Sequence, residues 1–195
     1  MRTALCTALV VLGILAGRAP PALAQVPSEL RSAEALAARV EAAEQSPMQA
    51  MALDEEVDLA TVEAELEEVA RFLDSHPDDA AALLLTVRLG RVRDLLAFRD
   101  AYMAIFEDPS AGEPMLPSNA PHLEVLDRVL ARDSTLAVAH YWKARLIVEE
   151  EARQAGALSQ LTPVPVLSGE GVARAVTEAR SAVAHDPSNA RYREF

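Results

Sequence analysis

The sequence has 195 residues with 18 basic and 30 acidic side chains, which gives a formal net charge of −12 at pH 7. This acidity argues against nucleic acid and anionic lipid as partners, because both recognise clustered cations. The single cysteine, Cys6, lies close to the N-terminus, so the chain beyond it has no disulfide, thiolate metal ligand or cysteine nucleophile.

Residues 1–24 have the three parts of a cleavable export signal. Arg2 gives a positive start, residues 4–16 form a charge-free apolar run, and Ala22-Leu23-Ala24 is a small-x-small cleavage site. The run is shorter than the ~20 residues that a spanning helix needs; an uncleaved anchor is the alternative. We expect a mature chain that starts at Gln25, has no integral membrane span and is periplasmic or secreted. The signal contains two arginines and no acid, so the mature net charge would be −14.

Helical spacing continues through residues 25–57, which are expected to form an N-terminal helical segment. Ser28 is placed to cap a helix that runs to about residue 45, and a short second helix is expected over residues 48–53. Asp58 then opens a stronger helix to Asp74. Its apolar residues recur at i+3 and i+4 steps, and glutamates fill the other faces.

The longest predicted helix follows a turn at His76-Pro77-Asp78-Asp79 and reaches Glu107. Pro77 fixes φ, and Asp78 or Asp79 can accept hydrogen bonds from the free amides of the first turn. Apolar residues mark two sides of this helix: Leu84, Val87, Leu95, Phe98, Tyr102 and Ile105 on one, and Leu89, Val92 and Leu96 on the other. A helix that is apolar on two sides packs on two sides, so we expect it at the centre of the fold.

The C-terminal half is predicted as three further helices separated by proline-rich loops. Asn119 caps the first, with Pro121 in its first turn, and Asp133-Ser134-Thr135 ends it and begins the second. The third spans residues 170–185. The chain then starts a helical turn after Pro187 that is too short to be stable alone. This turn must dock on the preceding helices, pair with another chain in a self-association, or belong to a shortened product.

Three of these turns align with one another, at residues 72–80, 129–137 and 182–190. Asp186-Pro187-Ser188-Asn189-Ala190 and His76-Pro77-Asp78-Asp79-Ala80 resemble the Asp-Pro-x-Asn/Asp-Ala turn of the tetratricopeptide repeat family. Further matches are the aromatic-plus-small segment of residues 139–144 and the small pair Ala175 and Ala182. The resemblance covers residues 58–195. It implies an all-α fold of antiparallel helical hairpins in a short tetratricopeptide-like α-solenoid.

The spacing of the turns departs from that family. Pro77 and Ser134 are 57 residues apart, and Ser134 and Pro187 are 53 apart, whereas the family repeat is about 34 residues long. The small pair becomes His122 and Val129 in the middle unit. The units are therefore expected to be degenerate, with an unrelated helical bundle as the alternative. The resemblance implies a concave groove that binds protein or peptide segments, without catalysis.

Three arginines of the central helix are candidate partner-binding residues. Arg91 interrupts the apolar stripe, with Arg88 before it and Arg99 after it, and neighbouring Gly90 permits a bend or a close helix contact. The Arg91 guanidinium either snorkels or pairs with a glutamate of the preceding acidic helix, or the three arginines line a groove that grips a carboxylate.

A second candidate set lies on the helix after Thr135: His140, Tyr141, Trp142 and Arg145. It is where a pocket would be sought if the chain were a small helical enzyme or ligand-binding protein, which is the alternative function. The sequence has no nucleophile elbow, phosphate loop or dinucleotide fingerprint. We therefore expect an exported, non-catalytic protein–protein interaction module without a cofactor, whose partner is an unidentified protein or peptide.

The remaining histidines and acidic runs are interpreted as structural. His76 and His185 lie at helix C-termini, where an imidazolium interacts favourably with the helix dipole. No two histidines have zinc-binding spacing, so no metal site is expected. The acidic run from Asp54 to Asp58 is interpreted as a helix entrance, and Glu149-Glu150-Glu151 as a solvated face.

Overall fold

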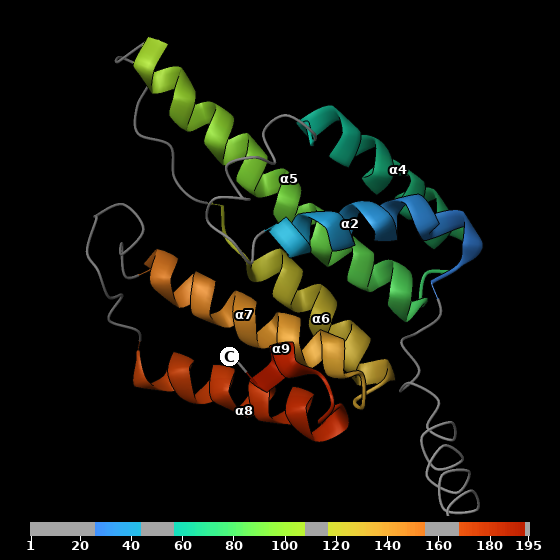
Figure 1. Ribbon diagram of the computed structural model, residues 1–195, viewed down its shortest axis with the longest axis vertical. Coiled ribbons are helices and arrows are strands. Elements are labelled where there is room, and N and C mark those ends of the chain that lie inside the picture. The colour runs from blue at the N-terminus through green and yellow to red at the C-terminus, as the bar shows by residue number, and fades with distance from the viewer. Residues whose placement is uncertain (1–25, 44–56, 108–116, 155–167, 194–195) are drawn as a thin grey trace, which may run out of the picture.

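The computed structural model describes residues 26–43, 57–107, 117–154 and 168–193 (Figure 1). The predicted export signal, the short helix expected over residues 48–53 and most of the acidic run before Asp58 lie outside these ranges. Within them every regular element is helical and none is a strand, which confirms the all-α prediction for this part of the chain. The elements are η1 (Ser28–Leu30), α2 (Arg31–Ala43), α4 (Leu59–Ser75), α5 (Ala80–Glu107), α6 (Ala120–Arg132), α7 (Ala137–Gln154), α8 (Gly169–His185) and α9 (Ala190–Arg193).

Helices that follow one another in the sequence also pack against one another. From α4 to α8, each helix contacts the next, and α2 rests on both α4 and α5 (Figure 1). The short α9 folds back onto α8. No helix in the described ranges is long and apolar enough to cross a membrane.

The central position predicted for the long helix is confirmed, because α5 belongs to two cores. Leu85, Leu89 and Val92 pack with α2 and α4 in one cluster. Leu83, Leu84 and Val87 pack with α6 and α7 in the other. Both sides are therefore buried over the first half of α5, and α2 is part of the same packed unit as the helices that follow it.

The three aligned turns share one hydrogen-bond pattern. The backbone N–H of the residue after each helix donates to the carbonyl four residues earlier, and the distance is 3.0 Å in every case: His76 to Phe72, Asp133 to Val129 and Asp186 to Ala182. Of the two predicted caps of α5, it is Asp79 that accepts, through Oδ1, from the Ala82 N–H at 2.8 Å. The three segments that match in sequence therefore also match in backbone geometry.

Close helix contacts occur at the positions that align with the small pair. Ala175 and Ala182 are buried, and so are their counterparts His122 and Val129. At Gly90 of α5, an added Cβ would lie 2.8 Å from Cε1 of His122 on α6. Glycine is thus required there for α5 to approach the imidazole, so Gly90 permits a close contact.

Two predicted helix starts differ in detail from the structure. The first helix begins as a 3-10 turn at Ser28, and no side-chain cap is formed there. Asn119 precedes α6 as predicted, yet its side chain makes no capping bond. Its backbone N–H is instead held by a glutamate of α7, as described below. By contrast, Ser168 caps α8 through a bond from the Gly171 N–H.

Candidate functional site

A cavity of about 260 Å³ lies between α2, the first half of α5 and the start of α7. Most of its wall is apolar, and its charged members are two glutamates of α2 and one arginine of α5. The lining residues are Val26, Glu34, Ala38, Glu41, Ala81, Leu84, Arg88, Leu136 and Val138. All but Val26 and Leu136 come from α2, α5 and α7, so the cavity depends on the docking of α2 against α5.

Arg88 joins the charged residues of this wall into one network. Its side chain is 8% exposed, and it donates from Nε to Glu41 and from Nη1 to Glu34, both at 2.5 Å. Burial alone would lower the pKa of Arg88, but the carboxylates of Glu41 and Glu34 outweigh burial and raise it. The guanidinium is therefore charged and is neutralised within the wall.

The network continues to the C-terminal helical turn. Arg191 of α9 donates from Nη1 to the second oxygen of Glu41 at 2.9 Å and from Nε to the hydroxyl of Tyr141 at 3.1 Å. Its guanidinium also lies 5.1 Å from the centre of the Tyr141 ring. Buried Tyr192 packs 5.2 Å from the same ring. Of the three alternatives given for this turn, docking on the preceding helices is the one that the structure shows for residues 190–193, and α9 is tied to α2.

A second pocket, of about 390 Å³, lies between the second half of α5, the start of α6 and the end of α7. It has a polar end and an apolar side. Its lining residues are Arg91, Asp94, Leu95, Phe98, Pro117, Asn119, Glu149 and Arg153.

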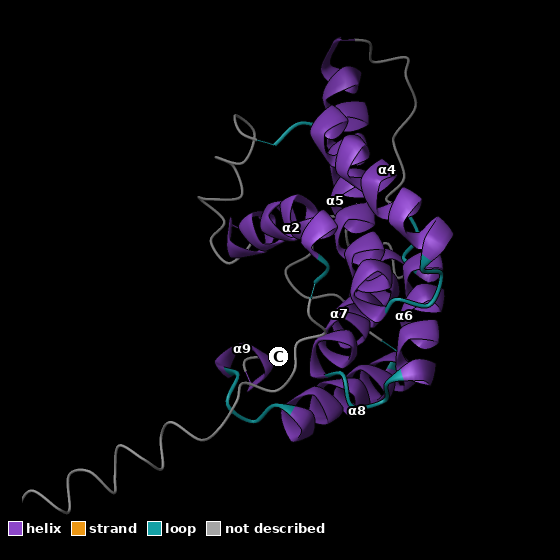
Figure 2. Cartoon of the chain, turned by 90° about the vertical axis from the view of Figure 1, so that its right-hand side faces the viewer, coloured by secondary structure: helices purple, strands orange, loops and turns teal. Residues whose placement is uncertain are grey.

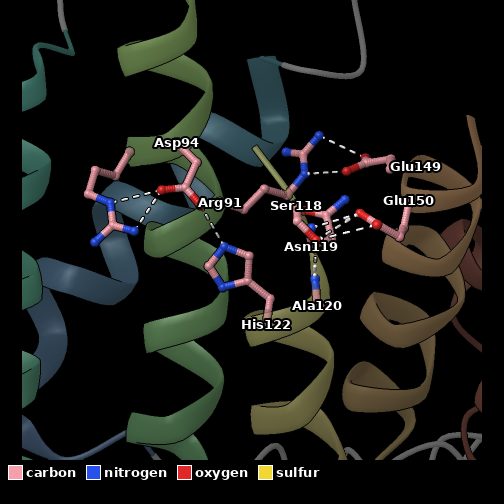
Figure 3. Close-up of polar contacts among 9 residues, drawn as sticks. Arg91, Asp94, Ser118, Asn119, Ala120, His122, Glu149 and Glu150 are labelled. Carbon is pink, nitrogen blue, oxygen red and sulfur yellow. Dashed lines mark hydrogen bonds and ion pairs between the residues drawn. The ribbon is translucent and has the colours of Figure 1, made fainter. Parts of the chain in front are cut away.

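The polar end is organised by a two-pronged ion pair between α5 and α7 (Figure 3). Arg91 donates from Nε and Nη2 to the two oxygens of Glu149, at 2.9 and 2.8 Å. The arginine side chain is 9% exposed and the glutamate side chain is 30% exposed. Glu149 also accepts from Nε of Arg145 at 3.1 Å. The carboxylate therefore lies at the rim of the pocket, bonded by two arginines.

Trp142 lies beneath this pair. It is buried, and the guanidinium groups of Arg91 and Arg145 are 5.9 and 5.1 Å from the centre of its ring. An aromatic face attracts cations in this position, so the tryptophan holds both arginines in place beside Glu149.

Glu150 binds the segment that leads into α6. It accepts from the backbone N–H of Asn119 at 2.9 Å and from the hydroxyl of Ser118 (Figure 3). Its other donors are Arg153 and Gln154 on its own helix. The hydrogen bond from Arg153 is the largest cause that lowers the pKa of Glu150 to about 2, against the cost of burial. The prediction of a solvated face for residues 149–151 is wrong at Glu150, because this carboxylate replaces the missing cap of α6.

Replacing Glu150 by glutamine is expected to remove an acid-sensitive part of the stability. A folded-state pKa of about 2, below the ordinary 4.5, means that the ionised form stabilises the fold fully above pH 4.5. This contribution is lost as the pH falls towards 2, and it is about 3 kcal/mol at neutral pH, since one pKa unit corresponds to about 1.4 kcal/mol. Urea unfolding at several pH values measures it. The free energy of unfolding of the wild type should exceed that of Glu150→Gln at pH 7, and the two values should converge near pH 2.

Glu124→Gln is the matched control for that experiment, because Glu124 is an exposed residue of α6. It makes the same change of charge without touching the start of the helix. A gap between wild type and Glu150→Gln that stays constant from pH 7 to pH 2 would contradict the role given to this carboxylate.

Asp94, which also lines this pocket, belongs to a second polar pair. His122 of α6 lies 2.9 Å from Asp94 of α5 through Nε2 (Figure 3). Arg93 donates to the same aspartate at 2.6 Å. Hydrogen bonds from His122 and Arg93 outweigh burial and lower the pKa of Asp94. The aspartate is thus ionised and already engaged by donors at neutral pH.

The three candidate arginines are not brought together in one groove. Arg88 pairs with α2, and Arg91 pairs with α7. Arg99 pairs with its neighbour Asp100 at 2.9 Å, farther along α5. The alternative in which Arg91 pairs with a glutamate of the preceding acidic helix is also wrong in its partner, because Arg91 pairs with Glu149 of α7.

The second candidate set is divided among different neighbours of α7. His140 contacts Glu178 of α8 at 2.6 Å and the carbonyl of Ser134 at 3.0 Å. Tyr141 points towards α9, and Trp142 is buried against α5. No residue of this set lines the larger pocket, but Trp142 and Arg145 contact the Arg91–Glu149 pair at its polar end.

The helix-end histidines have the positions that were predicted. His76 ends α4, with Nδ1 3.3 Å from the Phe72 carbonyl and its ring stacked on that of Phe72. His185 ends α8 and stacks on His140 at 5.6 Å. In the described ranges, no three His, Cys, Asp or Glu side chains gather in a way that could hold a metal ion.

Several residues of the two sites were not singled out from the sequence: Glu34, Glu41, Glu149, Arg153 and Arg191. Arg145 with Glu149 and Glu150 with Arg153 have i,i+4 and i,i+3 spacing on one helix, which is a visible signal for an ion pair. Glu41 pairs across 47 and 150 residues, and nothing local in the sequence indicates either contact.

Comparison with known proteins gives no relative. No family model, no curated protein and no solved structure matches the chain.

Proposed function

We propose that the chain is an exported, non-catalytic interaction module of the tetratricopeptide type. In this proposal it binds a protein segment on the face formed by α2, α5 and α7. The observation that carries the proposal is the shared geometry of the three turns. Each turn closes one helix with the same 3.0 Å backbone bond and opens the next. Repetition of one helical unit creates a continuous curved surface for partners.

The face itself supports a binding role. In Figure 2, α2 and α9 lie on the same side of α5 and α7, and Arg191 links them through Glu41 at 2.9 Å. The 260 Å³ cavity opens between α2, α5 and α7. Three helices that are not consecutive in the sequence thus contribute one wall each.

The cavity indicates what kind of partner it receives. Its volume of about 260 Å³ is below the ~300–1,000 Å³ of small-molecule pockets. It is therefore better suited to one apolar side chain of a larger partner. Glu34 and Glu41 both form ion pairs with Arg88. An apolar side chain can therefore enter the cavity while these charges stay paired within its wall. The proposed occupant is an extended protein segment that anchors itself by such a side chain.

The test fills the cavity from its exposed edge. Ala38 lines the cavity and is exposed to solvent, so Ala38→Trp blocks the site without entering the core. Purified wild type is cross-linked in an extract of the native cell envelope and culture fluid, and the captured segment is identified by mass spectrometry. Its synthetic peptide is then titrated against both proteins. Ala38→Trp should bind at least about tenfold more weakly, a difference of ~1.4 kcal/mol.

Ala173→Trp is the matched control, because Ala173 is an exposed alanine on α8. It adds the same side chain away from the cavity and should bind as wild type does. Equal binding by Ala38→Trp and Ala173→Trp would refute the proposed face. Turnover of a small substrate by the wild type would favour the enzyme alternative.

A further inference from the structure

The larger pocket has the two halves that an amphipathic small molecule requires. Leu95, Phe98 and Pro117 form its apolar side, and the Arg91–Glu149 pair forms its polar end. Its volume of about 390 Å³ falls within the ~300–1,000 Å³ typical of small-molecule sites, which combine apolar walls with a few convergent polar groups.

Arg91 is already shaped to bind a carboxylate. Its Nε and Nη2 donate in parallel to two carboxylate oxygens at 2.9 and 2.8 Å, which is the two-pronged geometry by which arginine recognises this group. Burial of the side chain and the Trp142 ring at 5.9 Å restrict its motion. The donors are thus positioned before any ligand arrives.

Glu149 is the group that a ligand would replace. Its side chain is 30% exposed at the pocket rim and it has a second donor, Arg145, at 3.1 Å. If the carboxylate leaves Arg91, its charge can remain with Arg145. The other acidic groups nearby are engaged elsewhere: Asp94 accepts from Arg93 and lies beside His122, and Glu150 accepts from Arg153.

We propose that this pocket binds a small monocarboxylate with an apolar tail, and that Glu149 occupies the carboxylate position when no ligand is bound. The ligand carboxylate would then accept from Nε and Nη2 of Arg91, and its tail would lie along Leu95 and Phe98. The site is separate from the cavity beside α2, so it does not depend on the interaction function proposed above.

The chain carries its own reporter for this exchange. Trp142 is the only tryptophan in the sequence, and it contacts both arginines that hold Glu149. Hexanoate is a suitable probe, and hexanol is its uncharged match. Hexanoate should change the tryptophan fluorescence of the purified protein saturably and raise its melting temperature, because a ligand that binds only the folded state stabilises it. Hexanol should do neither at the same concentration.

Two variants test the roles of the paired residues. Arg91→Gln should weaken hexanoate binding at least about tenfold, whereas Arg132→Gln should leave it unchanged. Arg132 is the matched control because it is exposed and pairs with Asp78. Glu149→Gln removes the internal competitor and keeps Arg91, so it should bind hexanoate several-fold more tightly than wild type. Hexanoate should also raise the melting temperature of Glu149→Gln by more than it raises that of the wild type.

The result for Glu149→Gln decides the proposal even if Arg91→Gln does not fold, which circular dichroism would reveal. A purely structural glutamate would give a destabilised variant with no gain in hexanoate affinity, and that outcome overturns the proposal. Equal responses to hexanoate and hexanol, or no saturable response in either wild type or Glu149→Gln, would overturn it as well. Ala38→Trp should bind hexanoate as wild type does, which separates this test from that of the protein-binding face.

Discussion

Trp142→Ala is expected to lower the free energy of unfolding by about 3–5 kcal/mol, as large-to-small substitutions of buried aromatic residues do. The indole is 2% exposed and belongs to the core shared by α5, α6 and α7. Its loss removes apolar burial, leaves a cavity and takes away the ring that lies under Arg91 and Arg145. Urea unfolding followed by far-ultraviolet circular dichroism measures the effect, since the variant has no tryptophan fluorescence.

Trp142→Phe separates the two contributions of the ring. It keeps an aromatic face of smaller area, so it should recover more than half of the stability lost by alanine. Tyr141, whose ring meets that of Trp142 edge to face at 6.1 Å, remains in both variants. If Trp142→Ala were no less stable than Trp142→Phe, the indole would not fill the core in the way described.

The parts of the fold that could be predicted from sequence are those set by local interactions. Apolar periodicity located α4 and α5, and the two apolar sides of α5 correctly indicated that it packs on two sides. The aligned turns also proved to share a backbone geometry, because the backbone N–H of the residue after each helix donates to a carbonyl only four positions earlier. The Asp58 and Asp79 side chains likewise accept from amides three residues farther along the chain. Such short-range interactions do not depend on the rest of the fold.

The sites were harder to predict because their residues are distant in the sequence. Arg88 and Arg91 could be recognised, since a charge in an apolar stripe is unusual and must be neutralised. Their carboxylate partners could not, because Glu41 and Glu149 are 47 and 58 residues away. When α7 is considered alone, three consecutive acidic residues at 149–151 suggest a face exposed to solvent. Only the packing of α7 against the start of α6 shows that Glu150 has a backbone amide to bind.

Arg88→Ala is expected to lower the free energy of unfolding by about 3 kcal/mol, because it removes the central residue of a buried ion-pair network. The guanidinium is 8% exposed and bonds both glutamates of α2. Without it, Glu41, whose side chain is 12% exposed in the wild type, keeps the ion pair with Arg191. The value lies at the low end of the 3–5 kcal/mol for such losses, because Glu34 is one-third exposed and can be solvated. Urea unfolding followed by Trp142 fluorescence provides the measurement.

Hydrogen exchange shows where that stability is lost. Arg88 attaches α2 to α5, and Glu41 attaches α2 to α9, so amides in these two outer helices should exchange faster in Arg88→Ala than in wild type. Amides in α6 and α7 should change less. Arg132→Ala, which breaks an exposed pair with Asp78, is expected to cost less than about 1 kcal/mol. Uniformly faster exchange across all helices would mean that α2 unfolds with the whole domain. Faster exchange confined to α2 and α9 would instead make the cavity wall a separately opening part of the fold, so a partner on that face would have to bind α2 in its docked position.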